Sequence, residues 1–103
     1  MTFSFHPDAR IEFIKSIDYY EKCEPGLGCD FSIQVYSTIQ NILAHPFVWP
    51  VLGSEEIHRC LINRFPYGII YCIEADQILI LAVMHLHREP GYWKERYDSP
   101  IEL

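Results

Sequence analysis

Two segments in the second half of the chain, Ile69–Ile73 and Ile78–Met84, are apolar at nearly every position. The polar run Glu74–Gln77 separates them and is typical of a hairpin connection between two strands. A strand that is apolar on both faces is expected to be buried on both faces. The chain must therefore fold so that both sides of this hairpin are covered.

The rest of the sequence predicts further elements before the hairpin. Phe3 and Phe5 alternate with polar residues, as in a short strand. Two stretches then repeat apolar residues at helical spacing, on either side of the helix-breaking segment Glu24–Gly28. The expected elements are a strand around 3–5, helices over 7–23 and 31–45, and strands over 57–62, 67–73 and 78–87.

This order, β-α-α-β-β-β, predicts an α+β fold in a single domain that spans residues 1–103. Two short helices can cover only one face of a four-stranded sheet. The second face then needs a cover from another source. The candidates are the C-terminal tail Tyr92–Leu103, the loop segment Phe47–Trp49, a second copy of the chain, or a binding partner.

The charge of the chain argues against a general nucleic-acid-binding protein. Lys and Arg number 8 and Asp and Glu number 14, which gives a formal net charge of −6. Broad binding of nucleic acid draws its affinity from clustered basic side chains. A small local positive site remains compatible with this charge, because five basic residues lie in the second half of the chain: Arg59, Arg64, Arg88, Lys94 and Arg96.

The start of the chain predicts a cytoplasmic protein that has no membrane segment. Residues Met1–Asp8 contain neither a basic region nor an apolar run typical of a signal peptide. The longest apolar run, Ile78–Met84, is too short to cross a bilayer. No C-x-x-C pair occurs, so we expect four free thiols and neither a metal nor a cofactor: Cys23, Cys29, Cys60 and Cys72.

An ordered set of short motifs runs along nearly the whole chain. They are H-P-x-A at His6–Ala9, helix-hairpin segments at Asp18–Glu21 and Pro25–Phe31, R-F-P-Y at Arg64–Tyr67, A-V-x-H at Ala82–His85 and R-x-P-x-Y-W at Arg88–Trp93. Each motif alone is weak, but their order and spacing together form a specific pattern. Through them the chain resembles the RelE/ParE superfamily of type II toxins, also called plasmid stabilisation proteins.

The resemblance implies a fold and a partner. The sheet would be mainly antiparallel with its first strand beside the last, two helices would pack on one face, and a short C-terminal tail would follow. A cognate antitoxin would wrap around the toxin and cover the second apolar face. The RelE branch of the superfamily cleaves mRNA on the ribosome, whereas the ParE branch binds and inhibits DNA gyrase.

The R-F-P-Y and A-V-x-H motifs resemble the ParE branch more closely. The chain also has less positive charge than the family pattern at two places, because His58 precedes Arg59 and His87 precedes Arg88 where more basic residues are common. We therefore expect a ParE-like, growth-inhibiting toxin that binds DNA gyrase. The alternatives are a ribosome-dependent mRNA endoribonuclease and an attenuated orphan homologue that serves as an interaction module.

Candidate site residues follow from these alternatives. A ribonuclease would use Arg59, Arg64, His85, Arg88 and Tyr92. Its arginines could clamp a phosphate, or they could instead pair with acidic residues among Glu55, Glu56, Glu89 and Glu95. His85 and His87 share a strand face and could serve as acid and base with Tyr92, or His85 could anchor the strand end through a hydrogen bond.

A protein that acts by binding would use an overlapping set of side chains. The expected partner-binding residues are Arg64, Tyr67, Arg88, Tyr92, Trp93 and Arg96. Tyr92 and Trp93 are expected to dock the tail on the sheet, because aromatic side chains with a polar tip suit half-buried positions. The sequence leaves open whether the chain forms a homodimer.

Overall fold

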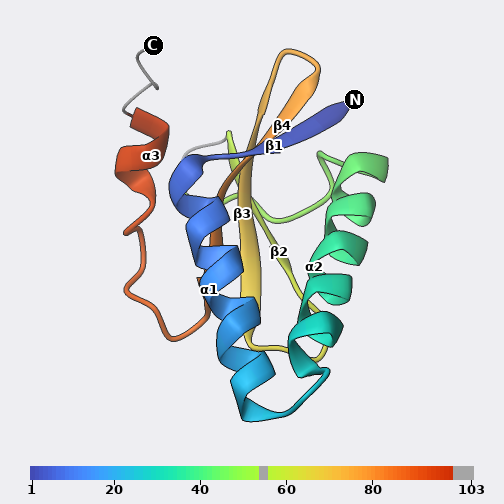
Figure 1. The fold of residues 1–103 in the computed structure, drawn as a ribbon. Helices are drawn as coiled ribbons and strands as arrows, with labels where there is room; N and C mark the ends of the chain where they lie inside the picture. Colours follow the sequence, from blue (N-terminus) through green and yellow to red (C-terminus); the bar gives the residue numbers. More distant parts are fainter. Residues whose placement is uncertain (54–55, 99–103) are drawn as a thin grey trace.

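The computed structural model describes residues 1–53 and 56–98. Its elements are β1 (Thr2–Phe5), α1 (Pro7–Cys23), α2 (Leu27–Ala44), β2 (Ile57–Leu61), β3 (Tyr67–Glu74), β4 (Gln77–His85) and α3 (Lys94–Asp98) (Figure 1). The β-α-α-β-β-β order is confirmed, and α3 is an addition that the sequence did not predict. Residues 99–103 of the expected tail and Glu55 lie outside the described residues.

The four strands form one sheet in the order β1-β4-β3-β2. The pairs β2–β3 and β3–β4 are antiparallel, and β1 runs parallel to β4 from Thr2 opposite Gln77 to Phe5 opposite Ile80. The predicted placement of the first strand beside the last is confirmed, as is the mainly antiparallel sheet. The last strand is shorter than predicted, because it ends at His85 and a turn follows.

The helix hairpin begins its second helix earlier than the sequence predicts. Gly26 adopts a left-handed conformation with φ 90°, which lets the chain reverse directly after α1. The Glu21 carboxylate accepts hydrogen bonds from the backbone N–H groups of Gly26 and Gly28, at 2.9 and 3.1 Å. A Cβ at Gly28 would meet the Ile17 carbonyl oxygen at 2.6 Å, so only glycine permits this close approach of the helices.

The main core lies between the helices and one face of the sheet, as predicted. Helix α2 contributes four fully buried side chains to it, at the helical spacing of the sequence: Phe31, Val35, Ile39 and Ile42. The sheet contributes alternate residues of its strands, among them Cys60, Ile69 and Tyr71. The hydroxyl of Tyr71 donates to the Pro46 carbonyl oxygen at 2.6 Å, which ties the end of α2 to the sheet.

The C-terminal tail packs on the second face of the sheet. Trp93 is 4% exposed and belongs to a second apolar cluster of strand residues, which comprises Ile57, Ile70, Cys72, Leu81, Ala82 and Met84. The loop segment that was an alternative cover lies elsewhere, because Trp49 packs against the helix-side core while Phe47 and Val48 are exposed. Of the covers that the sequence left open, the tail is therefore the one that the structure places on this face.

A β-bulge in β4 shapes the strand where the tail returns. Ile70 lies opposite Ala82 and Tyr71 lies opposite Ile80, so Leu81 has no residue opposite it. As a result Leu81 and Ala82, although adjacent in sequence, both belong to the second cluster. The bulge therefore brings additional apolar surface to the side that the tail covers.

Candidate functional site

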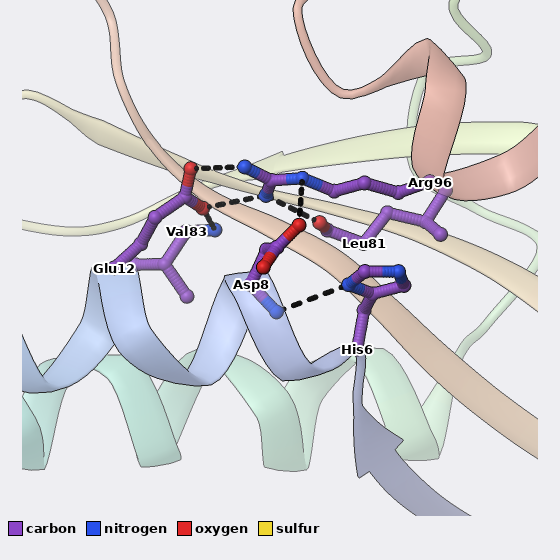
Figure 2. Close-up of polar contacts among 6 residues, drawn as sticks. All are labelled: His6, Asp8, Glu12, Leu81, Val83 and Arg96. Carbon is purple, nitrogen blue, oxygen red and sulfur yellow. Dashed lines mark hydrogen bonds and ion pairs between the residues drawn. The ribbon is translucent and has the colours of Figure 1, made fainter. Parts of the chain in front are cut away.

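The tail is fastened to the sheet by a largely buried ion pair (Figure 2). The Arg96 guanidinium donates from Nη1 and Nη2 to the two carboxylate oxygens of Glu12, at 2.9 and 2.8 Å. Its Nη1 also donates to the Leu81 carbonyl oxygen at 2.9 Å, and its Nε lies 3.9 Å from Asp8 Oδ2. The side chains of Arg96 and Glu12 are only 13% and 15% exposed, so this pair is shielded from solvent. One side chain thus joins α3, α1 and β4.

The same pair closes an open edge of the sheet. Strand β1 ends at Phe5, and the last backbone bond on this side of β4 runs from the His6 N–H to the Ile80 carbonyl oxygen at 2.8 Å. Beyond that point the backbone of β4 bonds to side chains. The Glu12 carboxylate accepts from the Val83 N–H at 3.1 Å, and Arg96 donates to Leu81. The Val83 N–H and the Leu81 carbonyl, which would otherwise be unpaired at the edge of the sheet, therefore both have hydrogen-bond partners.

Tyr92 lies between two arginines beside this pair. The guanidinium carbons of Arg88 and Arg96 lie 4.0 and 5.0 Å from its ring centroid, as in cation–π contacts. Burial, and then hydrogen bonding to Glu12, raises the pKa of the Tyr92 phenol above its ordinary value of 10.0. These surroundings favour the neutral phenol over the phenolate, so Tyr92 is better suited to donate a proton than to accept one.

Arg59 borders a hollow on the second face. Its side chain leaves β2 on the side away from the helices, and its Cγ would lie 3.2 Å from a Cβ placed on Gly68. The hollow has a volume of about 470 Å³ and lies between β2, β4 and the tail. Trp93 and Met84 line it together with Arg59 and Lys94.

Arg64 lies on the opposite side of the sheet, in the turn between β2 and β3. It has a positive φ of 71°, and its Nη2 lies 3.7 Å from Asp30 Oδ2 of α2. Both side chains are about half exposed, and such ion pairs are typically worth well under ~1 kcal/mol. Arg64 would therefore lose little free energy on leaving Asp30 to bind a partner.

His85 stands in a structural setting at the end of β4. Its Nδ1 accepts the backbone N–H of His87 at 3.0 Å, which is the kind of strand-end contact that the sequence left as an alternative. The ring of Tyr67 meets the His85 ring edge-on, with centroids 5.1 Å apart. His87 is not on the strand, but its ring lies 5.2 Å from that of His85, so the two imidazoles are still neighbours.

The structure gives each of the three predicted phosphate-binding arginines a different neighbourhood. Arg59 borders the hollow, Arg64 pairs with α2, and Arg88 lies on Tyr92. The predicted pairing with nearby glutamates is wrong for Arg64, whose partner is Asp30 from α2. In the tail, Arg96 pairs with Glu12 and Asp8 of α1. Contacts between residues so far apart in sequence leave no local signal.

The remaining predicted partner-binding residues are mostly turned inward. Tyr67 and Trp93 are 7% and 4% exposed, one in each apolar cluster. His58, which the sequence suggested as a loss of surface charge beside Arg59, is buried on the helix side. There its Nδ1 lies 2.8 Å from the Trp49 carbonyl oxygen and its ring stacks on Tyr71. Neighbouring residues of a strand face opposite ways, so His58 and Arg59 do not share a surface.

Sequence reasoning missed Glu12, whose carboxylate accepts hydrogen bonds from both Arg96 and the Val83 N–H in the tail attachment. The signal available was an acidic residue next to the apolar Phe13 in α1.

Across residues 1–53 and 56–98 no group of three His, Cys, Asp or Glu side chains is arranged to hold a metal ion. In the same part of the chain, no helix is both long and apolar enough to cross a membrane.

No family model matches the chain, and no curated protein matches it. Among solved structures, a chain of the chromosomal ParDE toxin–antitoxin system from P. aeruginosa is similar, with a TM-score of 0.73 and 12% sequence identity. The match covers 84% of this chain and 97% of that chain. At this identity the likeness concerns the fold. The chain therefore has the RelE/ParE-like fold that its sequence motifs predict.

Proposed function

We propose that the chain is a ParE-like toxin of a type II toxin–antitoxin pair, which acts in the cytoplasm by binding DNA gyrase and is neutralised by a cognate antitoxin. The observation that carries the proposal is the fold shared with a chain of the ParDE system over 84% of the length. The ordered motifs from His6–Ala9 to Arg88–Trp93 support it independently, because they come from the sequence alone.

Binding is favoured over RNA cleavage by the state of the candidate catalytic side chains. Arg59, Arg64 and Arg88 have separate neighbours, whereas a phosphate clamp needs them to converge. His85 Nδ1 is occupied by a backbone N–H. Burial, and then the contact with Glu12, raises the pKa of the Tyr92 phenol, which disfavours the phenolate that would take up the 2′-hydroxyl proton of RNA.

We place the antitoxin on the second face and its rim. Arg88 is exposed on this side, whereas Arg64, 57% exposed, lies toward the helix side and would be contacted only by a partner that wraps around the sheet. The buried members of the expected set would support the binding surface without contacting the partner. Trp93 and Arg96 hold the tail in place, and Tyr67 supports the end of β4 through His85. An antitoxin of opposite charge would find cations along this rim.

The proposal is tested by expressing the chain alone and together with the product of the small gene adjacent to its own. We expect growth arrest with the chain alone, relief on co-expression, and a co-purified complex. In vitro, the purified chain should inhibit supercoiling by gyrase, and the Arg88→Ala variant should inhibit less. Lys15→Ala serves as the matched control, because Lys15 is an exposed cation on α1, outside this rim.

Three outcomes would contradict the proposal. Codon-positioned cuts in mRNA from induced cells, lost in Arg88→Ala, would identify a ribonuclease instead. A stable complex with the neighbouring gene product, without growth arrest or gyrase inhibition, would identify an attenuated interaction module. Growth arrest with intact gyrase activity and intact mRNA would exclude gyrase as the target.

A further inference from the structure

The hollow on the second face combines an apolar floor with two cations. Ile57, Met84 and Trp93 supply the apolar lining, and Arg59 and Lys94 stand at its border. Its volume of about 470 Å³ falls within the range of sites that bind small molecules or side chains, roughly 300–1,000 Å³. None of the described lining residues is acidic. Across the described part of the chain, neither cation forms an ion pair.

Two glycines make room for the two cations. The stem of Arg59 lies against Gly68, where an added Cβ would approach its Cγ and Cδ to 3.2 and 3.4 Å. The stem of Lys94 lies against Gly91, where an added Cβ would approach its Cε to 3.3 Å. Gly91 has a positive φ of 80°, so this turn of the tail also requires glycine for its backbone. The two glycines thus leave space for the aliphatic stems of both cations at the border of the hollow.

We infer that this hollow is the anchor site for an acidic peptide segment of the antitoxin, which inserts an apolar side chain between two flanking carboxylates. The apolar side chain gains the burial that Trp93 and Met84 offer, and the carboxylates neutralise Arg59 and Lys94. The occupant is identified by charge complementarity, because a neutral apolar side chain would leave both cations unpaired. This inference rests on the proposed function only for the identity of the partner.

The test uses the two tryptophans of the chain as reporters. Trp93 lines the hollow, whereas Trp49 packs against the helix-side core. The full ¹⁵N-labelled chain is titrated with the capped peptide Ac-Ala-Glu-Leu-Glu-Ala-NH₂ and, as the neutral match, with Ac-Ala-Gln-Leu-Gln-Ala-NH₂. We expect a saturable shift of the Trp93 indole signal with the acidic peptide. The Trp49 signal should stay unchanged.

Variants then separate charge from packing. Arg59→Gln and Lys94→Gln should each weaken the acidic peptide about two- to fivefold, the range expected for partly exposed ion pairs, and should leave the weaker binding of the neutral peptide unchanged. Lys15→Gln, an exposed cation on α1, should change neither. The remaining amide spectrum of each variant reports that it is folded.

The inference is overturned by equal affinity for both peptides, by shifts at Trp49 in place of Trp93, or by no shift of Trp93 at peptide concentrations up to about 5 mM. Its failure is distinct from failure of the proposed function. A chain that arrests growth and is neutralised by its antitoxin, but whose Trp93 signal never moves, would refute the anchor site alone. A chain that binds the acidic peptide but neither arrests growth nor forms the complex would refute the proposed function alone.

Discussion

The two faces of the sheet are sealed in different ways. The helix side is covered by α1 and α2, with 17 and 18 residues, and α2 alone buries four large apolar side chains completely. The second side is covered by the short tail, whose buried apolar anchor in the described residues is Trp93 and whose fastening is the Arg96–Glu12 pair. A cover that depends on so few contacts should open at a lower free energy than the whole molecule. The difference indicates one stable core and one detachable cover.

The largest effect is expected from Phe31→Ala on the helix side. Phe31 is fully buried, and its ring meets those of Tyr20, Phe65 and Tyr67 at centroid distances of 4.9–5.1 Å. Truncation should lower the free energy of unfolding by about 4 kcal/mol. Urea denaturation measures it, with Tyr19→Ala, whose side chain is 60% exposed, as the control. A loss below ~1 kcal/mol would contradict the assignment of the main core to this side.

A smaller effect is expected from Trp93→Ala on the tail side. Removing this anchor should cost about 3 kcal/mol at most, because a detached tail can rearrange in water. The helix-side core should persist, so the secondary structure by far-ultraviolet circular dichroism should be retained while the second apolar cluster binds the dye ANS. Complete loss of secondary structure would show that the two sides form one cooperative unit.

The ion pair should contribute less than the tryptophan. Arg96→Ala leaves the Glu12 carboxylate partly buried, with the Val83 N–H and the Tyr92 hydroxyl as its remaining donors, which should cost about 2 kcal/mol. Lys22→Ala breaks the exposed pair with Asp18 and should lower the free energy of unfolding much less than Arg96→Ala does, because solvent screens that pair. A double-mutant cycle of Arg96→Ala with Glu12→Gln measures the coupling. Equal costs for the two pairs would remove the distinction between a fastened tail and an ordinary surface contact.

The effect that is smallest at neutral pH, and that grows only at alkaline pH, comes from one buried thiol on each side. Burial raises the pKa of Cys60 to about 11 and that of Cys72 to about 12, from an ordinary 9.0. The folded state therefore holds both thiol protons more tightly than the unfolded state. The resulting stability is fully present below pH 9 and is lost as pH rises toward 11–12.

Unfolding free energies measured between pH 8 and 11 check this expectation. The Cys72→Ala variant should lose stability less steeply with pH than the parent chain, and a Cys23→Ser, Cys29→Ser variant should keep the parent slope, because both of those thiols are exposed. An identical slope in Cys72→Ala and the parent would contradict a protonated thiol under the tail.

The sequence predicted one side of the molecule well and the other only in outline. Helical spacing from Phe31 to Ile42 and strand alternation are local patterns, so the helix-side core follows from them. The two-faced hairpin also predicted that a second cover must exist. The β-bulge at Leu81 and the contact of Arg96 with Glu12 join residues up to 84 positions apart, and no local pattern encodes such a contact.

The sequence likewise predicted only part of the candidate site. Docking of the tail through Tyr92 and Trp93 follows from aromatic residues placed after Pro90, and the structure places Trp93 on the sheet. The neighbours of Arg59, Arg64 and Arg88 depend on which face and which helix each one meets. Sequence spacing carries no information about these contacts, so it could not predict whether the three arginines converge.

Thiol labelling tests the central claim most directly, because Cys60 and Cys72 lie in different apolar clusters. In a chain carrying Cys23→Ser and Cys29→Ser, the labelling rates of the two buried thiols are followed against urea concentration. We predict that Cys72 reacts faster than Cys60 at low urea, with a weaker urea dependence, and that adding Arg96→Ala accelerates Cys72 alone. Equal rates with the same urea dependence, accelerated together by Arg96→Ala, would show that the tail opens only when the whole molecule unfolds and would contradict the account.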